Sequence, residues 1–212
     1  GGGVRARGMG EKQIEIDRRR ARERISKLKK RLASIHKEKN TQRKSRAREL
    51  KVAIVGYTNS GKTTLMSRLT KAEQAGEDVL FATLDSSVRL LDPVSRPKIL
   101  LSDTVGFIRN LPHSLVESFK STLDEVIEAD LLLHVVDLSH NNYNEQIEAT
   151  QKVLEEIGAG DIPTLMVFNK TDQLEDKFLP KLMKHKYPDS VFVSAQAEQN
   201  LGDLRDYVIE FF

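Results

Sequence analysis

The sequence contains no cysteine, and no stretch of it stays apolar for long enough to form a membrane-spanning helix. The absence of cysteine excludes disulfide frameworks and cysteine-based metal or nucleophile sites, and it is compatible with a reducing compartment. A spanning helix needs roughly 18 predominantly apolar residues. The first residues also lack the hydrophobic segment of a signal peptide. We therefore expect a cytoplasmic protein with no membrane span.

Aromatic residues are scarce at 6%, but hydrophobic residues in total make up 39%, which is enough for a packed core. The charged fraction of 31% indicates a heavily solvated surface. A length of 212 residues suits one domain of about 150 residues with an appendage. We expect a globular protein and a monomer.

The charges are distributed unevenly along the chain, although the net charge is only +3. Residues 1–50 hold 18 Lys and Arg against 6 Asp and Glu, which gives +12. The remainder holds 16 against 25, which gives −9. Such asymmetry points to a polyanionic partner for the basic end, and nucleic acid is the commonest one.

Proline and glycine are both absent from residues 11–48, which favours one long helix there. Apolar residues recur in steps of four and three, the spacing of a narrow seam along one helix face. The seam consists of Ala21, Ile25, Leu28, Leu32 and Ile35. Two interpretations remain open: a solvated helix that rests its seam on a partner helix, or an arm that binds nucleic acid through its Arg and Lys side chains.

Beyond residue 49, short apolar runs of strand length alternate with segments of helical periodicity. The predicted strands are residues 50–56, 98–103, 131–137, 164–170 and 190–195, and the predicted helices are 60–72, 114–129, 144–159 and 200–212. The strands show little polar alternation, which is typical of strands buried on both faces. This order predicts an α/β fold with right-handed βαβ units and a mainly parallel sheet flanked by helices. Residues 89–101 could add an antiparallel edge strand through a hairpin.

The most specific motif is GYTNSGKT, which follows a predicted strand and opens a helix, as a phosphate-binding loop requires. Backbone N–H groups and the positive helix end cradle the β-phosphate, Lys62 adds charge at the β/γ oxygens, and the Thr63 hydroxyl ligates Mg²⁺. The expected nucleotide-binding residues here are Gly56, Tyr57, Thr58, Asn59, Ser60, Gly61, Lys62, Thr63 and Thr64.

A second motif, NKTD, lies at the end of the predicted strand TLMVF. The Asp172 carboxylate can accept hydrogen bonds from N1–H and the 2-amino group of guanine, and adenine offers neither. A buried acceptor left unpaired by the wrong base is costly, so the motif favours GTP over ATP. We expect Asn169 to support the loop and Lys170 to cover the ring with its stem, with Thr171 between them and Asp172.

A third motif, DTVG, ends the predicted strand KILLS and comprises Asp103, Thr104, Val105 and Gly106. We expect Asp103 to hold Mg²⁺ through a water. The Gly106 backbone N–H is expected to meet the γ-phosphate and to report its loss.

Two weaker signals complete the set. Thr83, in a segment without strong structure of its own, is the candidate that closes the Mg²⁺ shell in the GTP state. Ser194 and Ala195 end the last predicted strand, where a backbone N–H could touch guanine O6. The nucleotide-binding residues around Thr83 are Phe81, Ala82, Leu84 and Asp85. The catalytic contacts are assigned to Lys62, Thr83 and Gly106, and the metal ligands to Thr63, Thr83 and Asp103.

In order along the chain, these motifs resemble those of the guanine-nucleotide-binding domain of translation-factor-class small GTPases. The resemblance implies a Ras-like P-loop G domain with Mg²⁺ as cofactor, preceded by a long basic helix. Many Ras-like proteins place a water-orienting Gln directly after the DTVG position, where this chain has Phe107. Phe107 can neither orient nor polarise water, which predicts slow intrinsic hydrolysis even if it is simply a core residue. Asn59 matches an asparagine of potassium-activated GTPases, which implies a K⁺ ion in place of an arginine finger.

The flanking stretches GGGVRARGMGEKQIEIDRRR, LFATLD and GFIRNLPHSLVESFKSTL resemble HflX-type GTPases, and the resemblance spans residues 1 to about 200. Members of that family bind the large ribosomal subunit, and several separate stalled or idle ribosomes into subunits. Their pattern places an N-terminal α/β subdomain and the first helix of a helical pair before the glycines. We therefore expect a fragment or a reduced member of the family.

The resemblance implies two parts: residues 1–49, a glycine-rich tip and basic helical arm forming half of a helical hairpin, and residues 50–212, the GTP-binding G domain. Glycines at the tip permit close approach to RNA, while Arg5 and Arg7 supply phosphate contacts. The expected function is hydrolysis of GTP to GDP and phosphate. It would time association with the large ribosomal subunit and its rRNA and serve to split or recycle stalled ribosomes.

Two other functions remain open. One is a GTPase of ribosome assembly or RNA modification, and the other is a signalling switch that has no RNA contact. The charge of the arm favours RNA, and the stretch GFIRNLPHSLVESF favours HflX-type proteins over assembly factors.

Overall fold

The structure is a computed structural model that describes residues 14–28, 30–31, 34, 49–70, 87–91, 98–104, 106–107 and 120–212. The chain divides into two compact units, Gly1–Arg48 and Glu49–Phe212. None of the helices in the described ranges is long and apolar enough to cross a membrane. Several residues expected to have a role lie outside the described ones, namely residues 1–13, Leu32, Ile35, Phe81, Ala82, Thr83, Leu84, Asp85 and Val105.

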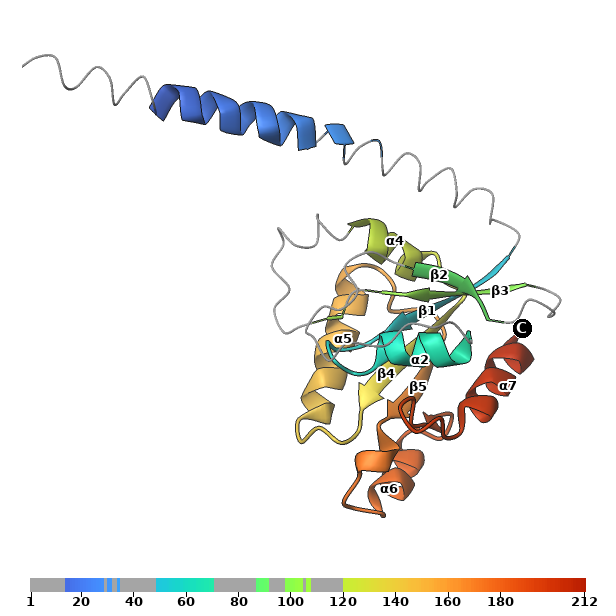
Figure 1. Cartoon of the computed structure of the whole chain (residues 1–212). Helices are drawn as coiled ribbons and strands as arrows, with labels where there is room; N and C mark the ends of the chain where they lie inside the picture. Colours follow the sequence, from blue (N-terminus) through green and yellow to red (C-terminus); the bar gives the residue numbers. More distant parts are fainter. Residues whose placement is uncertain are drawn as a thin grey trace, which may run out of the picture. The chain divides into compact units, whose positions relative to one another are not determined.

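Residues 14–28 of the first unit form a helix, as the missing proline and glycine predict (Figure 1). Arg19 Nε donates a hydrogen bond of 3.0 Å to Glu23 Oε1 one turn further along, which supports the helix slightly. Two members of the seam, Ile25 and Leu28, are 53% and 57% exposed. The part of the apolar seam that the structure describes is therefore a solvent-facing surface within this unit.

The second unit is built on a six-stranded sheet in the order β2-β3-β1-β4-β5-β6 (Figure 1). All neighbouring pairs are parallel except β2 and β3, which are antiparallel. This confirms the mainly parallel sheet and the antiparallel edge strand expected from the sequence. The strands are β1 Leu50–Val55, β2 Ser87–Leu90, β3 Ile99–Asp103, β4 Leu131–Asp137, β5 Thr164–Asn169 and β6 Val191–Phe192.

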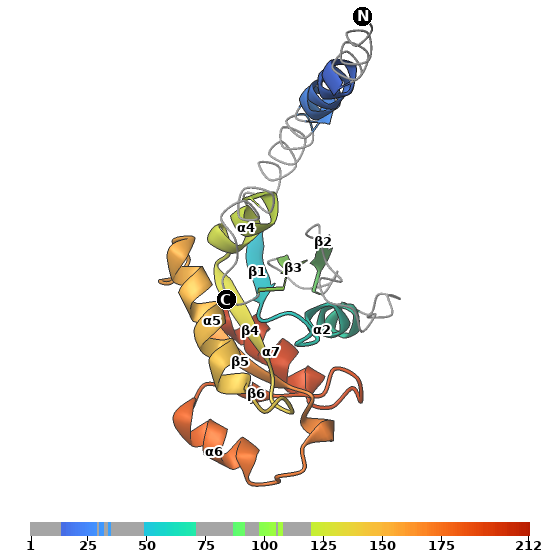
Figure 2. The ribbon, with the colours of Figure 1, turned by 90° about the vertical axis from the view of Figure 1, so that its left-hand side faces the viewer.

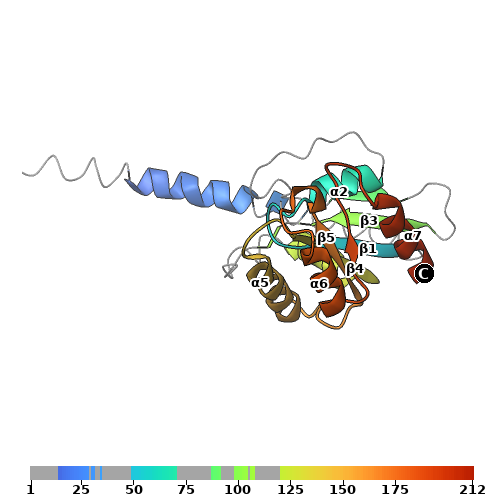
Figure 3. The same cartoon turned by 90° about the horizontal axis from the view of Figure 1, so that it is seen from below.

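Helices lie on both faces of this sheet, as expected for βαβ units. In Figures 2 and 3, α5 lies on one side of the sheet and α2 on the other. The helix α6 was not among the predicted elements, and β6 is shorter than the predicted run 190–195. The helices are α2 Lys62–Leu69, α4 Lys120–Ile127, α5 Tyr143–Glu156, α6 Leu179–Lys186 and α7 Leu201–Phe211, with a 3-10 turn η1 Thr171–Gln173.

Burial explains why the strand sequences lack polar alternation: β3 and β4 are buried along their whole length. One cluster packs side chains of β1, β3, β4 and β5 against α2 and α7. A second cluster packs the opposite face of β1 and β4 against α4 and α5. A third lies around Phe168 and Met183 and fixes α6 to the end of the sheet.

The parallel register brings the carboxyl ends of four strands to one edge. Ile54 of β1 is level with Asp103 of β3, and Asp137 of β4 is level with Asn169 of β5. In open α/β sheets, ligands bind beyond the carboxyl ends of the strands. The fold therefore gathers the predicted motifs, which lie far apart in sequence, along this single edge.

Candidate nucleotide-binding site

The loop between β1 and α2 depends on three residues with positive φ. Gly56 and Gly61 have φ of 149° and 90°, and Asn59 has φ of 60°. Asparagine is one of the few side chains that adopts this left-handed region readily. A Cβ on Gly56 would lie 2.2 Å from the carbonyl oxygen of Val135, and one on Gly61 would lie 2.3 Å from Asn169 Nδ2. The two glycines are therefore required by close packing as well as by backbone conformation.

Lys62 begins α2 and is only 6% exposed. Its Nζ donates a hydrogen bond of 2.8 Å to the carbonyl oxygen of Tyr57 inside the loop. Burial lowers the pKa of Lys62 to about 8, and the nearby Asp103 carboxylate partly opposes this shift. A buried ammonium in the mouth of a loop is a strong attractor for phosphate oxygens, because little water screens its charge.

Thr63 and Asp103 supply the oxygen atoms expected for a metal site. Thr63 Oγ1 donates a hydrogen bond of 2.7 Å to Asp103 Oδ2, which joins the start of α2 to the end of β3. A hydroxyl and a carboxylate are hard oxygen donors of the kind that Mg²⁺ takes together with substrate phosphates. Within the described ranges no group of three or more His, Cys, Asp or Glu side chains could hold a metal by itself. The residues therefore fit a Mg²⁺ ion that is shared with a nucleotide.

The segment after β3 folds back onto the phosphate loop. Phe107 N–H donates to the Gly56 carbonyl at 3.0 Å, and Thr58 N–H donates to the Phe107 carbonyl at 2.8 Å. The Phe107 side chain is 0% exposed and packs in the cluster between the sheet, α4 and α5. The structure therefore shows Phe107 to be a core residue.

Gly106 lies against the phosphate loop at very short range. A Cβ at this position would lie 2.7 Å from Thr58 Cα and 3.1 Å from Lys62 Nζ. The backbone of Gly106 is thus beside the ammonium expected to meet the γ-phosphate. The neighbouring Thr104 is 1% exposed, and its hydroxyl donates a hydrogen bond of 2.6 Å to the Ile54 carbonyl. Its side chain therefore links the end of β3 to β1 and is not directed to the nucleotide site.

Asn169 connects the phosphate and base-reading elements. Its Nδ2 donates to the Ser60 carbonyl at 2.9 Å, and its Oδ1 accepts from Ala195 N–H at 3.0 Å. Asn169 is 2% exposed, so both hydrogen bonds are shielded from water. The Ala195 N–H expected at guanine O6 is here directed to Asn169.

Asp172, the candidate guanine acceptor, is exposed and held in place by the loop after β6. Ser194 Oγ donates to Asp172 Oδ1 at 2.5 Å, and Ala197 N–H donates to Ser194 Oγ at 3.0 Å. This chain of hydrogen bonds orients the carboxylate from outside its own loop. Ser194 thus holds Asp172, a role beyond the one expected for it from the sequence.

Lys170 is held by a residue that the sequence motifs did not select. Its backbone has φ of 62°, and its Nζ lies 2.8 Å from Asp137 Oδ2 at the end of β4. Asp137 Oδ1 accepts hydrogen bonds from Ser139 N–H at 3.0 Å and Ser139 Oγ at 2.6 Å. Asp137 is 8% exposed and both of its carboxylate oxygens have partners, so the ion pair is partly shielded from water. In the sequence, the only sign of this role is that Asp137 ends an apolar strand, LLLHVVD.

His134 is a second residue that sequence reasoning did not select. It is 1% exposed and lies level with Val55 below the phosphate loop, and its Nδ1 has no hydrogen-bond partner among the described residues. Burial lowers its pKa from 6.5 to about 3, and the positive charge of Lys62 adds to the effect. In the sequence, His134 could have been noticed as a single polar residue within the apolar strand LLLHVVD.

The arrangement defines the class of the domain. A phosphate loop opens a helix after β1, a hydroxyl–carboxylate pair lies beside it, and an Asn–Lys–Asp loop bonds directly to its backbone. Together with the strand order, this is a Ras-like P-loop domain of the guanine-nucleotide-binding type.

Comparison with known proteins agrees with this class. Residues 51–170 match the family model described as 50S ribosome-binding GTPase, and residues 1–46 match the one described as GTP-binding GTPase Middle Region. GTPase HflX of Gluconacetobacter diazotrophicus is 48% identical over 214 residues, which cover 100% of this chain and 47% of that protein. GTPase HflX of Escherichia coli strain K12 is 46% identical over 207 residues, which cover 96% of this chain and 48% of that protein.

Solved structures give the same result for the fold. A GTP-binding protein from the hyperthermophilic archaeon Sulfolobus solfataricus, in complex with GDP, matches with a TM-score of 0.62 and 32% identity over 93% of this chain and 60% of its own. Era in complex with MgGDPNP and a fragment of 16S ribosomal RNA matches with a TM-score of 0.60 and 23% identity over 77% of this chain and 56% of its own. The second likeness supports the fold alone.

The chain belongs to the GTPase family described as 50S ribosome-binding GTPase, because that family model covers more than half of it, and it is similar to HflX GTPases along its length. It spans about half the length of the curated relatives that it matches.

Proposed function

We propose that this chain binds GTP with Mg²⁺, hydrolyses it to GDP and phosphate, and uses the reaction to time its association with the large ribosomal subunit. The observation that carries the proposal is the bond from Asn169 Nδ2 to the Ser60 carbonyl, because it locks the base-reading loop to the phosphate loop. One ligand that contains both guanine and phosphates fits such a joined site. The description of the matching family as ribosome-binding supports the partner.

Each end of the nucleotide has its own residues in this proposal. Loop N–H groups and the buried Lys62 bind the phosphates, and the Gly106 N–H lies close enough to Lys62 to sense the γ-phosphate. Asp172 accepts from the guanine edge while Ser194 holds its orientation. A Mg²⁺ ion bound by Thr63 and Asp103, with Thr83 as the expected third ligand, would neutralise charge on the β- and γ-phosphates.

Intrinsic hydrolysis is expected to be slow. Phe107 packs in the core, so the position after DTVG does not orient water. Asn59 is exposed on the loop with its backbone in the left-handed region, where its amide is available to a K⁺ ion. Turnover is therefore expected to rise when K⁺ or a partner group enters the site.

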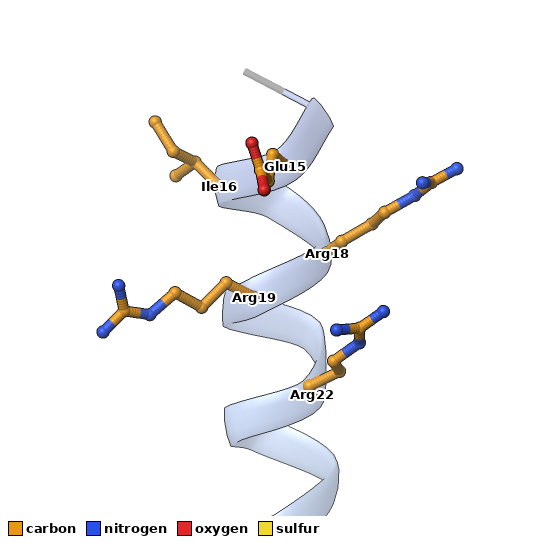
Figure 4. Close-up of a pocket in the computed structure, with 5 residues that line it drawn as sticks. All are labelled: Glu15, Ile16, Arg18, Arg19 and Arg22. Carbon is orange, nitrogen blue, oxygen red and sulfur yellow. The ribbon is translucent and has the colours of Figure 1, made fainter. Parts of the chain in front are cut away.

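The basic arm is the proposed RNA contact, and residues 50–212 are the proposed GTP-binding domain. Figure 4 shows Arg18, Arg19 and Arg22 projecting outward from one helix, beside Glu15 and Ile16. These five side chains line an open recess on the helix surface. Arg18 and Arg22 project from one side of the helix and Arg19 from the other (Figure 4). Exposed guanidinium groups suit the phosphates of rRNA, and their binding should weaken steeply with salt. The same arm charge disfavours a signalling switch without RNA contact.

The test is co-sedimentation with large ribosomal subunits in the presence of GDP or a non-hydrolysable GTP analogue. We expect the full chain to sediment more with the analogue, and we expect deletion of residues 1–20 to reduce sedimentation most at low salt concentration. Equal sedimentation of both forms would refute the role of the arm. Equal sedimentation with GDP and with the GTP analogue would refute the proposal that GTP hydrolysis times ribosome association. A ribosome-assembly role predicts instead a preference for precursor particles over mature subunits.

A further inference from the structure

The outer surface of α6 is unusual within the second unit. We use the name α6 surface for Lys177, Phe178, Lys181, Leu182 and His185, all of which are exposed. Phe178 and Leu182 are 77% and 63% exposed, the highest values among the large hydrophobic side chains that the structure describes. They are four residues apart and therefore neighbours on one helix face.

This exposure does not come from a loosely attached helix. Met183 on the opposite face is 2% exposed and packs in the same cluster as Phe168. Tyr187 follows the helix and its ring lies 5.6 Å from that of Phe168. Figures 1 and 2 place α6 at one end of the domain, so its outer face is open to a partner.

The charge of the helix is opposite to that of the domain around it. Residues 177–187 hold 4 Lys and no Asp or Glu, whereas the rest of residues 51–212 holds 12 Lys and Arg against 25 Asp and Glu. Lys184 donates to the Ser190 carbonyl at 2.7 Å, and Lys186 lies 5.3 Å from the centre of the Tyr187 ring. Those partners are neutral, so the positive charge of the helix is not neutralised by them.

We propose that the α6 surface binds single-stranded RNA. Phe178 and His185 offer rings on which unpaired bases stack, and Lys177 and Lys181 beside them meet the phosphates. Leu182 lies between the two rings and extends the apolar contact. The proposal goes beyond the function proposed above and does not depend on ribosome binding by the arm.

RNA is a better occupant than an acidic polypeptide on two grounds. Lysine is depleted at the centre of protein–protein interfaces, whereas here lysines alternate with the apolar residues on one short face. The surface also offers the rings of Phe178 and His185, each of which a base covers with its own flat face at little cost in side-chain entropy.

The test measures binding of residues 49–212, a compact unit that lacks the basic arm, to fluorescein-labelled polyuridylate, and it compares three variants. Phe178→Ala leaves the charge unchanged and should weaken binding roughly 5-fold through lost stacking. Lys181→Glu should weaken it roughly 10-fold through a lost phosphate contact and a new repulsion. Lys152→Glu on α5 makes the same change in charge at another exposed lysine and should have much less effect than Lys181→Glu. All three variants should bind fluorescent GDP as the unmodified chain does, because the changed side chains are exposed.

Three results would overturn the proposal. The first is polyuridylate affinity that Phe178→Ala leaves unchanged, and the second is an equal loss in Lys152→Glu and Lys181→Glu. The third is tighter binding of polyglutamate than of polyuridylate with the same dependence on Phe178, which would identify an acidic polypeptide as the occupant. Duplex RNA is the internal control, because its bases are not open to stacking and Phe178→Ala should not change its binding. Since no ribosomes are used, failure here is distinct from failure of the arm in the sedimentation experiment.

Discussion

The two ends of the nucleotide site are organised differently. At the base end, residues outside the Asn–Lys–Asp loop hold its side chains: Ser194 donates to Asp172, and Asp137 pairs with Lys170. At the phosphate end, the groups that would meet the ligand bond among themselves, since Lys62 donates to the Tyr57 carbonyl and Thr63 to Asp103.

This difference assigns different tasks to the two ends. At the base end the Asp172 carboxylate is already oriented by Ser194, so its hydrogen bonds to guanine carry little cost in rearrangement. The phosphate end has to exchange internal hydrogen bonds for those to phosphate and metal, so its response depends on what is bound. Specificity is therefore expected at the rigid end and switching at the end that exchanges partners.

The largest effect is expected from a substitution that removes guanine recognition at the base end. Asp172→Asn replaces the acceptor pair that faces guanine N1–H and the 2-amino group. GTP affinity should fall about 1,000-fold or more, while xanthosine triphosphate should bind better than it does to the unmodified chain. Competition of each triphosphate against a fluorescent nucleotide measures both changes. Nucleotide preference that stays the same would show that Asp172 does not read the base.

The next largest effect is expected from a substitution that removes phosphate binding and leaves the packing of the loop intact. Lys62→Met keeps the buried stem and removes the charge, so triphosphate affinity should fall on the order of 100-fold. Because an ammonium with its pKa lowered to about 8 by burial is costly to the fold, the melting temperature should not fall. Calorimetry of binding and of unfolding on the same variant separates the two. Retained affinity would exclude Lys62 from the phosphate site.

The sequence predicted the chemistry of this site better than the supports that hold it. Gly56, Gly61 and Asn169 could be found because their roles permit few residue types at fixed positions. Asp137 could not, because its partner Lys170 lies 33 positions further along and the two meet only through the pairing of β4 with β5. A carboxylate at a strand end is too common to reveal such a contact.

The elements of the fold also differ in how well the sequence predicted them. Strands buried on both faces were evident from apolar runs, and five of the six strands of the sheet fall within the predicted runs, with β2 arising from the suggested hairpin. The helix α6 was not predicted, and Pro180 occupies one of its first two positions, where proline is tolerated. The run 190–195 was predicted too long, since beyond Phe192 the chain turns into the loop that holds Asp172.

A third prediction sharpens the contrast through pH. His134 lies below the phosphate end, and its pKa is lowered from 6.5 to about 3 in the folded chain. Between pH 6.5 and about pH 3, His134 is therefore protonated in the unfolded chain and neutral in the folded chain. The free energy of unfolding should therefore fall with decreasing pH by about 1.4 kcal/mol per unit within that window. Between about pH 6 and pH 4.5 the loss should total about 2 kcal/mol.

The variant His134→Leu isolates this contribution, because leucine continues the apolar strand and cannot be protonated. Urea unfolding of both proteins across the window should give curves whose difference grows as the pH falls, in favour of the variant. Carboxylates titrate in both proteins and cancel in that difference. A difference independent of pH would mean that His134 is protonated equally in the folded and unfolded chains.

The smallest effect tests whether the base end owes its order to Asp137. Asp137→Asn removes the charge that holds Lys170 and keeps the shape of the side chain, so GDP should dissociate roughly 5- to 10-fold faster. The preference for guanine over xanthine should not change, because Asp172 and Ser194 keep their own bond. Glu128→Gln is the matched control, since it removes the carboxylate of another lysine pair, 2.9 Å from Lys51, at the opposite edge of the sheet. If both variants release GDP at the rate of the unmodified chain, the rigidity of the base end comes from Asn169 and Ser194 alone. If Asp137→Asn also alters the choice of base, Lys170 and Asp172 act as one unit, and recognition and loop order cannot be assigned to separate residues.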